Sequence, residues 1–467
     1  MPQFNKITWN IIQALITICA EANVLTDVES LHHYGHDETE DFNFPPEVVV
    51  KPETTEQVSQ VVRLCNQNNI PVTARGAGTG LSGGALAVEG GICLSLERMN
   101  RILEIDEKNL QATVQPGVIN EVFQQAVKEK GLFYPPDPAS KGSCFLGGNL
   151  AENAGGPKAV KYGVTKDYVL NLQVVLASGE VIWTGANTLK NATGYNLTQL
   201  MIGSEGTLGI ITQVVFRLIP HPQQTLLLLA AFTSATKACE AVSAIFRKGI
   251  TPSGMEFMER DAIDWVKQYL DIPFPVKDEI QAHLLIEVDG NYLEQLYQEV
   301  EIINTVLEEH GVDEVMLADS DHEKDRLWQM RRKVAEAVHA NSVYKEEDTV
   351  VPRYELPRLL SGVKEIGSKY GFRSVCYGHA GDGNLHVNII KGDLTDEQWN
   401  GTIKQGIREI FQLVVSLGGT LSGEHGIGYV QKEFMDIVFD KTSLDLMRAV
   451  KDVFDPKGVL NPGKVVT

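Results

Sequence analysis

The sequence feature that most constrains this chain is the glycine-rich run RGAGTGLSGGA, which begins at Arg75. Gly78, Gly80 and Gly83 have the spacing of a dinucleotide-binding turn, but such a turn must open a helix whose N-terminus holds the pyrophosphate. Here a second strand-like run, residues 91–96, comes shortly afterwards. The order strand, glycine loop, strand therefore argues against a Rossmann unit. It predicts instead a row of backbone N–H groups, with an arginine beside it, that can cradle a diphosphate.

Two further loops repeat this composition. Residues 135–156 combine prolines, paired glycines and asparagines, and residues 203–212 read GSEGTLGIIT. Small residues of this kind let a backbone approach a flat polar ligand closely. Tight turns alone could explain any one loop, but three of them favour an extended cofactor threaded along all three. Before the first loop we expect an amphipathic helix over 55–68 and a strand over 71–74.

The pattern with the most chemical content lies in GHAGDGNLH and in GEHG, residues 423–426. The β-prone run 373–378, the Gly-Asp-Gly turn after it and the alternating run 385–390 predict a hairpin. In its second arm His386 and Asn388 point to one face, and the apolar residues between them point to the other. The polar face is therefore expected to carry a site while the apolar face packs.

These two stretches supply a ligand set for a divalent metal. His379, His386 and Glu424 offer two imidazoles and a carboxylate. Such a set suits Zn²⁺, Fe²⁺ or Mn²⁺ and leaves coordination positions open for a substrate. His425 then remains as a base. The alternative is that these histidines are hydrogen-bonded loop residues with no metal, and the second cluster set among glycines makes that alternative weaker.

Length and net charge restrict the classes of protein to which this chain can belong. A chain of 467 residues is long enough for two domains. Its content of 43% hydrophobic and 22% charged residues is ordinary for a globular protein. The net charge of −20 argues against a nucleic-acid partner, although a local basic pocket for a small anion is compatible with it.

Six scattered cysteines without a CxxC pair predict reduced, mostly buried thiols and a cytoplasmic location. The apolar stretch 11–20 contains Gln13 and Thr17 and is too short to cross a membrane. We therefore expect an amphipathic docking helix there and no transmembrane segment. A peripheral association with a membrane stays open.

Motifs along nearly the whole chain resemble the FAD-dependent D-2-hydroxyacid dehydrogenases of the vanillyl-alcohol-oxidase flavoprotein fold, a family that includes D-lactate, glycolate and D-2-hydroxyglutarate dehydrogenases. The motifs are VLTDVESLHHYGHDETE, RGAGTGLSGG, GSEGTLG, GHAGDGNLH and DPKGVLNPGK. The resemblance implies an α+β protein with a two-subdomain FAD-binding domain over residues 1–222. It further implies a cap domain with an antiparallel sheet covered by helices over 223–430, and a C-terminal segment, 431–467, that returns to the FAD domain.

The resemblance also implies how FAD is held. Many relatives with covalently bound flavin carry histidine where this chain has Thr79, so we expect FAD to be bound without a covalent link. Asn461, in LNPGK, would approach the flavin. The implied cofactor-binding residues are Arg75, Gly76, Ala77, Gly78, Thr79, Gly80, Ser82, Gly83, Pro136, Asp137, Ser143, Gly147, Gly148, Asn149, Asn153, Gly156, Glu205, Gly206, Ile211 and Asn461.

In this family the residues that match His379, His386 and Glu424 bind a divalent metal, and the residue that matches His425 is the catalytic base. A metal chelated by the carboxylate and 2-hydroxyl of the substrate lowers the pKa of that hydroxyl. A neutral histidine can then take the proton while hydride passes from C2 to FAD. The implied substrate-binding residues are Arg331, Lys345 and Asn388.

Ser320 and Glu323 form a capping-box signature for one helix through residue 340, whose apolar stripe includes Arg331. The planar fork of an arginine suits an organic acid, and an ion pair at the helix edge is the alternative. Relatives that act on D-2-hydroxyglutarate tend to carry threonine one turn later, where this chain has Ala335. We therefore expect D-lactate as the substrate, ahead of D-2-hydroxyglutarate or glycolate.

The same resemblance implies an electron acceptor, which would be an electron-transferring flavoprotein, a quinone or a cytochrome, and a homodimer is compatible with it. Three other classes of protein are alternatives. A metallohydrolase would use the histidine and glutamate site with a metal-bound water, and a non-catalytic flavin-binding subunit would not need His425. A nicotinamide-dependent dehydrogenase is disfavoured because the helix of a Rossmann turn is missing.

Overall fold

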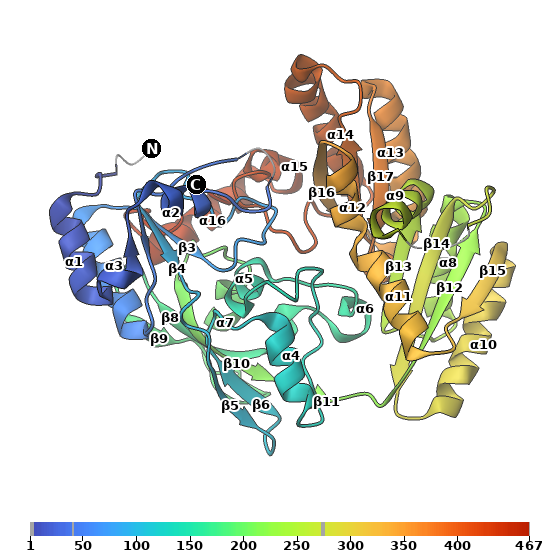
Figure 1. The fold of residues 1–467 in the computed structure, drawn as a ribbon, viewed down its shortest axis with the longest axis horizontal. Coiled ribbons are helices and arrows are strands. Elements are labelled where there is room, and N and C mark those ends of the chain that lie inside the picture. Colours follow the sequence, from blue (N-terminus) through green and yellow to red (C-terminus); the bar gives the residue numbers. More distant parts are fainter. Residues whose placement is uncertain (1–3, 40–41, 272–275, 467) are drawn as a thin grey trace. The chain divides into compact units, whose positions relative to one another are not determined.

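The computed structural model describes residues 4–39, 42–271 and 276–466, which form two compact units (Figure 1). The first unit contains the described residues up to Gly155, residues 164–221 and the described residues from Glu424 onward. The second unit contains residues 156–163 and, where described, 222–423. Both units combine helices with sheets, so the predicted α+β class is confirmed.

The unit boundaries differ from the predicted domain boundaries in two places. Residues 156–163 fold with the second unit, where Lys161 Nζ donates a hydrogen bond to Asp289 Oδ1 at 2.6 Å. The chain from Glu424, the second residue of the GEHG motif, folds with the first unit, where the N–H of Tyr429 donates to the carbonyl of Ser82 at 2.8 Å. Both differences arise from contacts between residues far apart in the sequence.

The first unit is built on three sheets. Its strands are β1 (Val24–Leu25), β2 (Val48–Val50), β3 (Val72–Arg75), β4 (Ile92–Ser95), β5 (Ile102–Asp106), β6 (Gln111–Val114), β7 (Leu132–Phe133), β8 (Val169–Val175), β9 (Val181–Trp183), β10 (Ile210–Arg217) and β11 (Ile219–Pro220). Its α-helices are α1 (Trp9–Cys19), α2 (Val28–His33), α3 (Thr55–Asn68), α4 (Asn120–Lys128), α5 (Leu146–Glu152), α7 (Leu197–Met201), α15 (Met435–Val438) and α16 (Lys441–Phe454). Among the described residues, the sheet orders are β1-β2-β4-β3, β5-β6-β10-β8-β9 and β11-β7.

Helix α3 matches the predicted helix over 55–68, and Thr54 caps it by accepting the N–H of Gln57 at 3.2 Å. Its apolar face, which includes Val58, packs with Leu15 of α1 in one core. The predicted helix near the N-terminus is therefore confirmed, and its docking role stays a prediction. The glycine-rich run connects β3 to β4, which pair in parallel. The predicted order of strand, glycine loop and strand is therefore confirmed.

The second unit is built on one antiparallel sheet. Its strands are β12 (Gln224–Phe232), β13 (Gly254–Glu259), β14 (Ala282–Gly290), β15 (Val312–Leu317), β16 (Tyr344–Val350), β17 (Arg373–Gly378) and β18 (Asn384–Ile390). Its α-helices are α6 (Ala159–Tyr162), α8 (Ala235–Arg247), α9 (Arg260–Leu270), α10 (Leu293–Glu309), α11 (Asp321–Arg332), α12 (Val334–Asn341), α13 (Leu356–Tyr370) and α14 (Ile403–Ser416). In the part of the chain that the structure describes, the strand order is β15-β12-β14-β13-β17-β18-β16.

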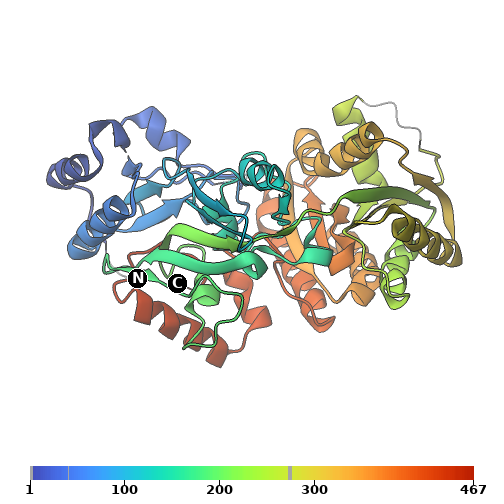
Figure 2. The ribbon, with the colours of Figure 1, turned by 90° about the horizontal axis from the view of Figure 1, so that it is seen from below.

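Helices cover both faces of this sheet, as Figure 1 and Figure 2 show. Helices α9, α11 and α12 contact one another on one face, and α8, α10, α13 and α14 contact the other. The core of the first face contains Met258 of β13, Tyr377 of β17 and Leu327 of α11. Because side chains alternate along a strand, every second residue of β13, β17 and β18 points into this covered face.

The predicted single helix from Ser320 through residue 340 is wrong. Helix α11 ends at Arg332 and α12 begins at Val334, with Lys333 between them. The capping prediction is confirmed, because the Ser320 hydroxyl accepts the N–H of Glu323 at 3.3 Å. Leu327 of α11 and Val334 of α12, on the two sides of this interruption, lie in one apolar core.

All six cysteines are buried and none forms a disulfide, as expected from the sequence. Burial raises the pKa of the Cys19 thiol to about 11 and that of the Cys93 thiol to about 12. These thiols are therefore protonated and unreactive at neutral pH. No helix in the described ranges is long and apolar enough to span a membrane.

Candidate functional site

The loop after β3 forms a cradle around a buried cation in the first unit. Arg75 is the last residue of β3 and is 6% exposed, and its Nη1 has no hydrogen-bond partner among the described residues. Gly78 and Gly83 have φ angles of +78° and +73°, which residues with a side chain rarely adopt. A Cβ atom at Gly78 would overlap with Arg75 Nη2. An unpaired guanidinium N–H beside a glycine-rich backbone fits a diphosphate group.

The second glycine loop lies in the same unit and leaves open space beside two of its glycines. A Cβ atom at Gly148 of α5, like one at Gly80 of the first loop, would meet no atom within 4 Å. Asn149 is buried and donates from Nδ2 to Asn120 Oδ1 at 3.1 Å, which holds this turn in place. Backbone with this much clearance can lie directly against a flat ligand.

The C-terminal segment returns to these loops. Asn461 donates from Nδ2 to the carbonyls of Gly84, at 3.0 Å, and of Glu205, at 2.7 Å. Lys464 in turn donates to Asn461 Oδ1 at 2.8 Å. The asparagine predicted from LNPGK therefore joins the first and third glycine loops.

Glu205 of the third loop holds another backbone segment. Its carboxylate oxygens accept the N–H groups of Ile427, at 2.9 Å, and Gly428, at 2.7 Å, which lie just after the GEHG motif. Burial raises the pKa of Glu205 to about 7. Burial, and then the neighbouring Glu205 charge, raise the pKa of Glu152 well above its usual range. Glu152 was not predicted from the sequence, where its only signal was a carboxylate beside the glycine and asparagine loop.

The other predicted cofactor residues lie on these loops or beside them, and their role stays a prediction. Gly76, Ala77, Thr79 and Ser82 belong to the first loop; Pro136, Asp137, Ser143, Gly147 and Asn153 belong to the second; Gly206 belongs to the third, and Ile211 to β10. Ser143 is exposed, whereas Asp137 and Ser82 are buried. Gly156 lies in the segment that folds with the second unit.

The predicted hairpin is confirmed as β17 and β18, with Tyr377 opposite His386. On the other side of β18, strand β16 places Asp348 opposite His386 and Glu346 opposite Asn388. All residues of β18 are buried. The predicted polar face is therefore a polar strip inside the second unit, and the two carboxylates that line it were not predicted from the sequence.

Glu256, at the other end of this strip, was also not predicted from the sequence. It is fully buried, and its Oε1 and Oε2 lie 2.9 and 2.8 Å from His379 Nδ1. Its Oε2 also lies 2.8 Å from Arg331 Nη2. The signal was available in GMEFME, where one carboxylate stands between two apolar residues of a strand.

The two predicted histidine ligands lie close together in the second unit, where the ring centroids of His379 and His386 are 5.4 Å apart. Glu424 is bonded to Gly423, whose N–H donates to Asp348 Oδ2 at 2.8 Å. Glu346 adds a carboxylate within the second unit, with its Oε1 3.2 Å from His386 Nδ1. Imidazole and carboxylate donors at this separation fit a divalent ion such as Zn²⁺, Fe²⁺ or Mn²⁺.

Two of the three predicted substrate residues face this strip. Arg331 is 5% exposed; its Nη2 pairs with Glu256 Oε2 at 2.8 Å, and its Nε makes no hydrogen bond with the described residues. Asn388 is fully buried, and its Oδ1 likewise has no hydrogen-bond partner in the described part of the chain. Lys345 is opposite Ile389 in the sheet, so alternation points it to the other face, where its Nζ lies 5.0 Å from the Trp399 ring.

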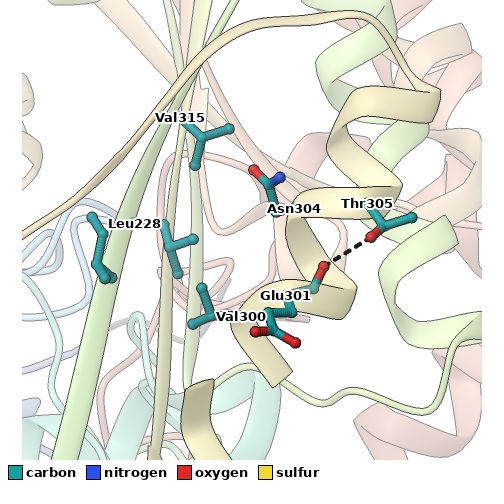
Figure 3. A pocket seen from close by; sticks show the side chains of 7 residues that line it. Leu228, Val300, Glu301, Asn304, Thr305 and Val315 are labelled. Atoms are coloured by element: carbon teal, nitrogen blue, oxygen red, sulfur yellow. Dashed lines mark hydrogen bonds between the residues drawn. The ribbon is translucent and has the colours of Figure 1, made fainter. Parts of the chain in front are cut away.

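A separate hollow of about 430 Å³ lies in the second unit between α10 and the strands β12 and β15 (Figure 3). Its lining residues are Leu228, Val300, Glu301, Asn304, Thr305, Val315 and Leu317. None of the predicted site residues lines it. The chemistry of this chain is therefore expected at the loops and the polar strip and not in this hollow.

Known proteins resemble this chain over nearly its whole length. Residues 46–185 match the family described as "FAD binding domain", and residues 221–465 match "FAD linked oxidases, C-terminal domain". The chain is 38% identical over 460 residues to "Glycolate oxidase subunit GlcD" of Bacillus subtilis (strain 168), which covers 98% of this chain and 97% of that protein. It is also 38% identical over 469 residues to "D-lactate dehydrogenase" of Anaerostipes hadrus, which covers 99% and 98%. The chain therefore belongs to the FAD-linked oxidases.

A solved structure of p-cresol methylhydroxylase with substrate bound has the same fold. It matches with a TM-score of 0.82 over 100% of this chain and 99% of that chain, at 20% sequence identity. Such a level of identity supports the fold alone. The predicted vanillyl-alcohol-oxidase type of fold is confirmed, and the family matches confirm FAD as the predicted cofactor.

Proposed function

We propose that this protein oxidises a small D-2-hydroxyacid, in the first place D-lactate, to the 2-oxoacid, with FAD and a divalent metal. The observation that carries the proposal is the pair of buried imidazoles of His379 and His386, whose ring centroids lie 5.4 Å apart, in a chain of the FAD-linked oxidases. The carboxylate of Glu346 lies beside them, with its Oε1 3.2 Å from His386 Nδ1. The names of two relatives, a D-lactate dehydrogenase and a glycolate oxidase subunit, support the substrate class.

In this proposal each residue of the site has a separate role. When bound, the metal supplies a Lewis acid for the 2-hydroxyl and FAD supplies the hydride acceptor. His379, His386 and Glu424 hold the metal. His425 takes the proton of the 2-hydroxyl as general base. Arg331 binds the carboxylate of the substrate, because its buried guanidinium keeps an Nε–H group without a hydrogen-bond partner among the described residues.

FAD is held without a covalent bond in this proposal, by the loop after β3. Arg75 Nη1 supplies a buried donor for the diphosphate, and the glycines supply backbone N–H groups at close range. Thr79 carries no imidazole that could link to the flavin.

The preference for D-lactate rests on the surroundings of Ala335. This residue packs against the apolar core around α9 and α11 and offers no hydroxyl to a second carboxylate. The interruption at Lys333 means that Ala335 does not follow Arg331 by one turn of an unbroken helix. The preference for a small substrate therefore depends on this apolar environment more than on helical spacing.

The test is the visible spectrum of the purified protein under anaerobic conditions. Addition of D-lactate with Zn²⁺ or Mn²⁺ present is expected to bleach the flavin bands, and prior removal of metal with a chelator is expected to prevent the bleaching. Bleaching by D-2-hydroxyglutarate but not by D-lactate would refute D-lactate as the substrate and assign D-2-hydroxyglutarate instead. Bleaching that chelation leaves unchanged would refute the metal role, and a colourless protein with hydrolytic activity would favour the metallohydrolase.

A further inference from the structure

The register of the sheet brings a carboxylate to one of the proposed metal ligands. Strands β13 and β17 pair antiparallel, with Phe257 opposite Gly378. One step further along this ladder, Glu256 falls opposite His379. Directly opposed residues of an antiparallel pair have Cβ atoms about 4.5–5.5 Å apart on the same face, so their side chains meet. The distances of 2.9 and 2.8 Å from the two Glu256 oxygens to His379 Nδ1 result from this register.

The same carboxylate also reaches the proposed substrate arginine. Glu256 Oε2 lies 2.8 Å from Arg331 Nη2, and both side chains are buried, at 0% and 6% side-chain exposure. A buried carboxylate needs partners for its charge and its lone pairs. Glu256 therefore joins a residue of α11 to the residue that comes directly after β17.

We propose that Glu256 positions the metal site, an inference that rests on the proposed function. Its carboxylate accepts the Nδ1–H of His379, which leaves Nε2 as the ligand atom and fixes the plane of the ring. Through Arg331 it also sets the place of the substrate carboxylate relative to the metal. Glu256 itself touches neither metal nor substrate, so it is a positioning residue.

The competing explanation is that Glu256 only neutralises Arg331 in the interior. The two explanations differ in what a Glu256→Gln variant does. The glutamine amide has two possible orientations. If its oxygen accepts the Nδ1–H of His379, its NH₂ group points at the guanidinium of Arg331, where two donors meet. If its oxygen accepts from Arg331, its NH₂ group donates to His379 Nδ1 and favours the tautomer that carries the proton on Nε2. Loss of the carboxylate at such a position usually weakens metal binding by about 10–100-fold. A purely structural role would lower stability without changing the affinity for metal.

The experiment measures the dissociation constant for Zn²⁺ of the full-length, FAD-bound protein by competition with a chromogenic chelator. We expect Glu256→Gln to bind Zn²⁺ about 10–100-fold more weakly than the unchanged protein. Glu256→Asp keeps the charge and is expected to restore part of the affinity. If Glu256→Gln does not fold, Glu256→Asp carries the test, and a Zn²⁺ affinity equal to that of the unchanged protein would refute the inference.

The matched control is Glu287→Gln. Glu287 is a buried carboxylate on the neighbouring strand β14, and it accepts hydrogen bonds from Ser253 at 2.6 Å and Trp328 at 3.0 Å. The substitution removes the same charge from the same sheet, and the Zn²⁺ affinity is expected to stay within twofold of the unchanged protein, a limit of about 0.4 kcal/mol.

The outcomes distinguish the positioning role from the proposed function. If the unchanged protein binds Zn²⁺ and Glu256→Gln binds it with the same affinity, the positioning role is refuted and the proposed function is unaffected. An equal loss of affinity in Glu256→Gln and Glu287→Gln also refutes it, because the effect would then be general. If the unchanged protein does not bind Zn²⁺ or Mn²⁺ at all, the metal part of the proposed function fails and the positioning role fails with it.

Discussion

Replacement of Lys451 by methionine tests how the C-terminal segment is held to the flavin-binding unit. Lys451 of α16 is 4% exposed, and its Nζ donates to the carbonyls of Thr207, at 2.7 Å, and Leu460, at 2.9 Å. Its third partner is Asp455 Oδ2 at 2.5 Å. One ammonium group thus ties the helix, the third glycine loop and the segment before Asn461 together.

The expected cost can be worked out from these contacts. Removing one partner of a buried ion pair costs about 3–5 kcal/mol, because the other charge is left without compensation. Asp455 is 1% exposed, and within the described residues its carboxylate then keeps the N–H groups of Val459, at 3.1 Å, and Leu460, at 2.7 Å. For a unit of this size, 1 kcal/mol corresponds to roughly 2–4 °C in Tm, so Lys451→Met should lower Tm by about 6–20 °C.

Thermal unfolding monitored by circular dichroism and by flavin fluorescence measures this effect. Lys451→Met should release flavin at the lower temperature, since Thr207 belongs to the third glycine loop. Lys441→Met on the same helix is the control, because Lys441 is 87% exposed and pairs only at the surface. In a double-mutant cycle with Asp455→Asn the two effects should not add. A loss below about 1 kcal/mol, or strict additivity, would refute the reasoning.

The flavin site and the proposed base give three further predictions. Acid precipitation should release all flavin into the supernatant, because Thr79 offers no covalent link, and yellow pellets would contradict this. His425→Ala should slow anaerobic flavin reduction by about 10²–10⁴-fold, with the Zn²⁺ affinity kept, and unchanged turnover would instead favour a non-catalytic subunit. Burial raises the pKa of Glu205 from 4.5 to about 7 in the folded state. Its contribution to stability is therefore complete below pH 4.5 and is lost as pH rises towards 7. In denaturant titrations between these pH values, the free energy of unfolding of Glu205→Gln should depend less on pH than that of the unchanged protein.

Much of the fold could be predicted from local patterns. The helix over 55–68, the hairpin that ends in residues 385–390 and the glycine loop after Arg75 each depend on residues close together in the chain, and each prediction is confirmed. The helix through residue 340 failed for the opposite reason. Its periodicity is continuous across Lys333, but the backbone of Lys333, with φ −91° and ψ 6°, separates α11 from α12.

The placement of Lys345 shows the limit of carrying a residue over from a family. The residue is at the expected position in the sequence, but the pairing of β16 with β18 points it away from His386 and Asn388. Strand alternation was readable in VYKEED, but the faces could be assigned only once the partner strand and its register were known.

By itself the sequence determined the class of protein, the glycine-rich loops proposed to hold FAD, and the histidines and glutamate of the candidate metal site, because each of these depends on a short motif. The tertiary structure alone decided which buried carboxylates stand behind those motifs. Glu256 reaches His379 across an antiparallel register, and Glu346 and Asp348 reach the hairpin from a third strand. These contacts join residues far apart in the chain, and their register is set by which faces of the sheet the helices cover, a property of the whole unit and not of any one segment.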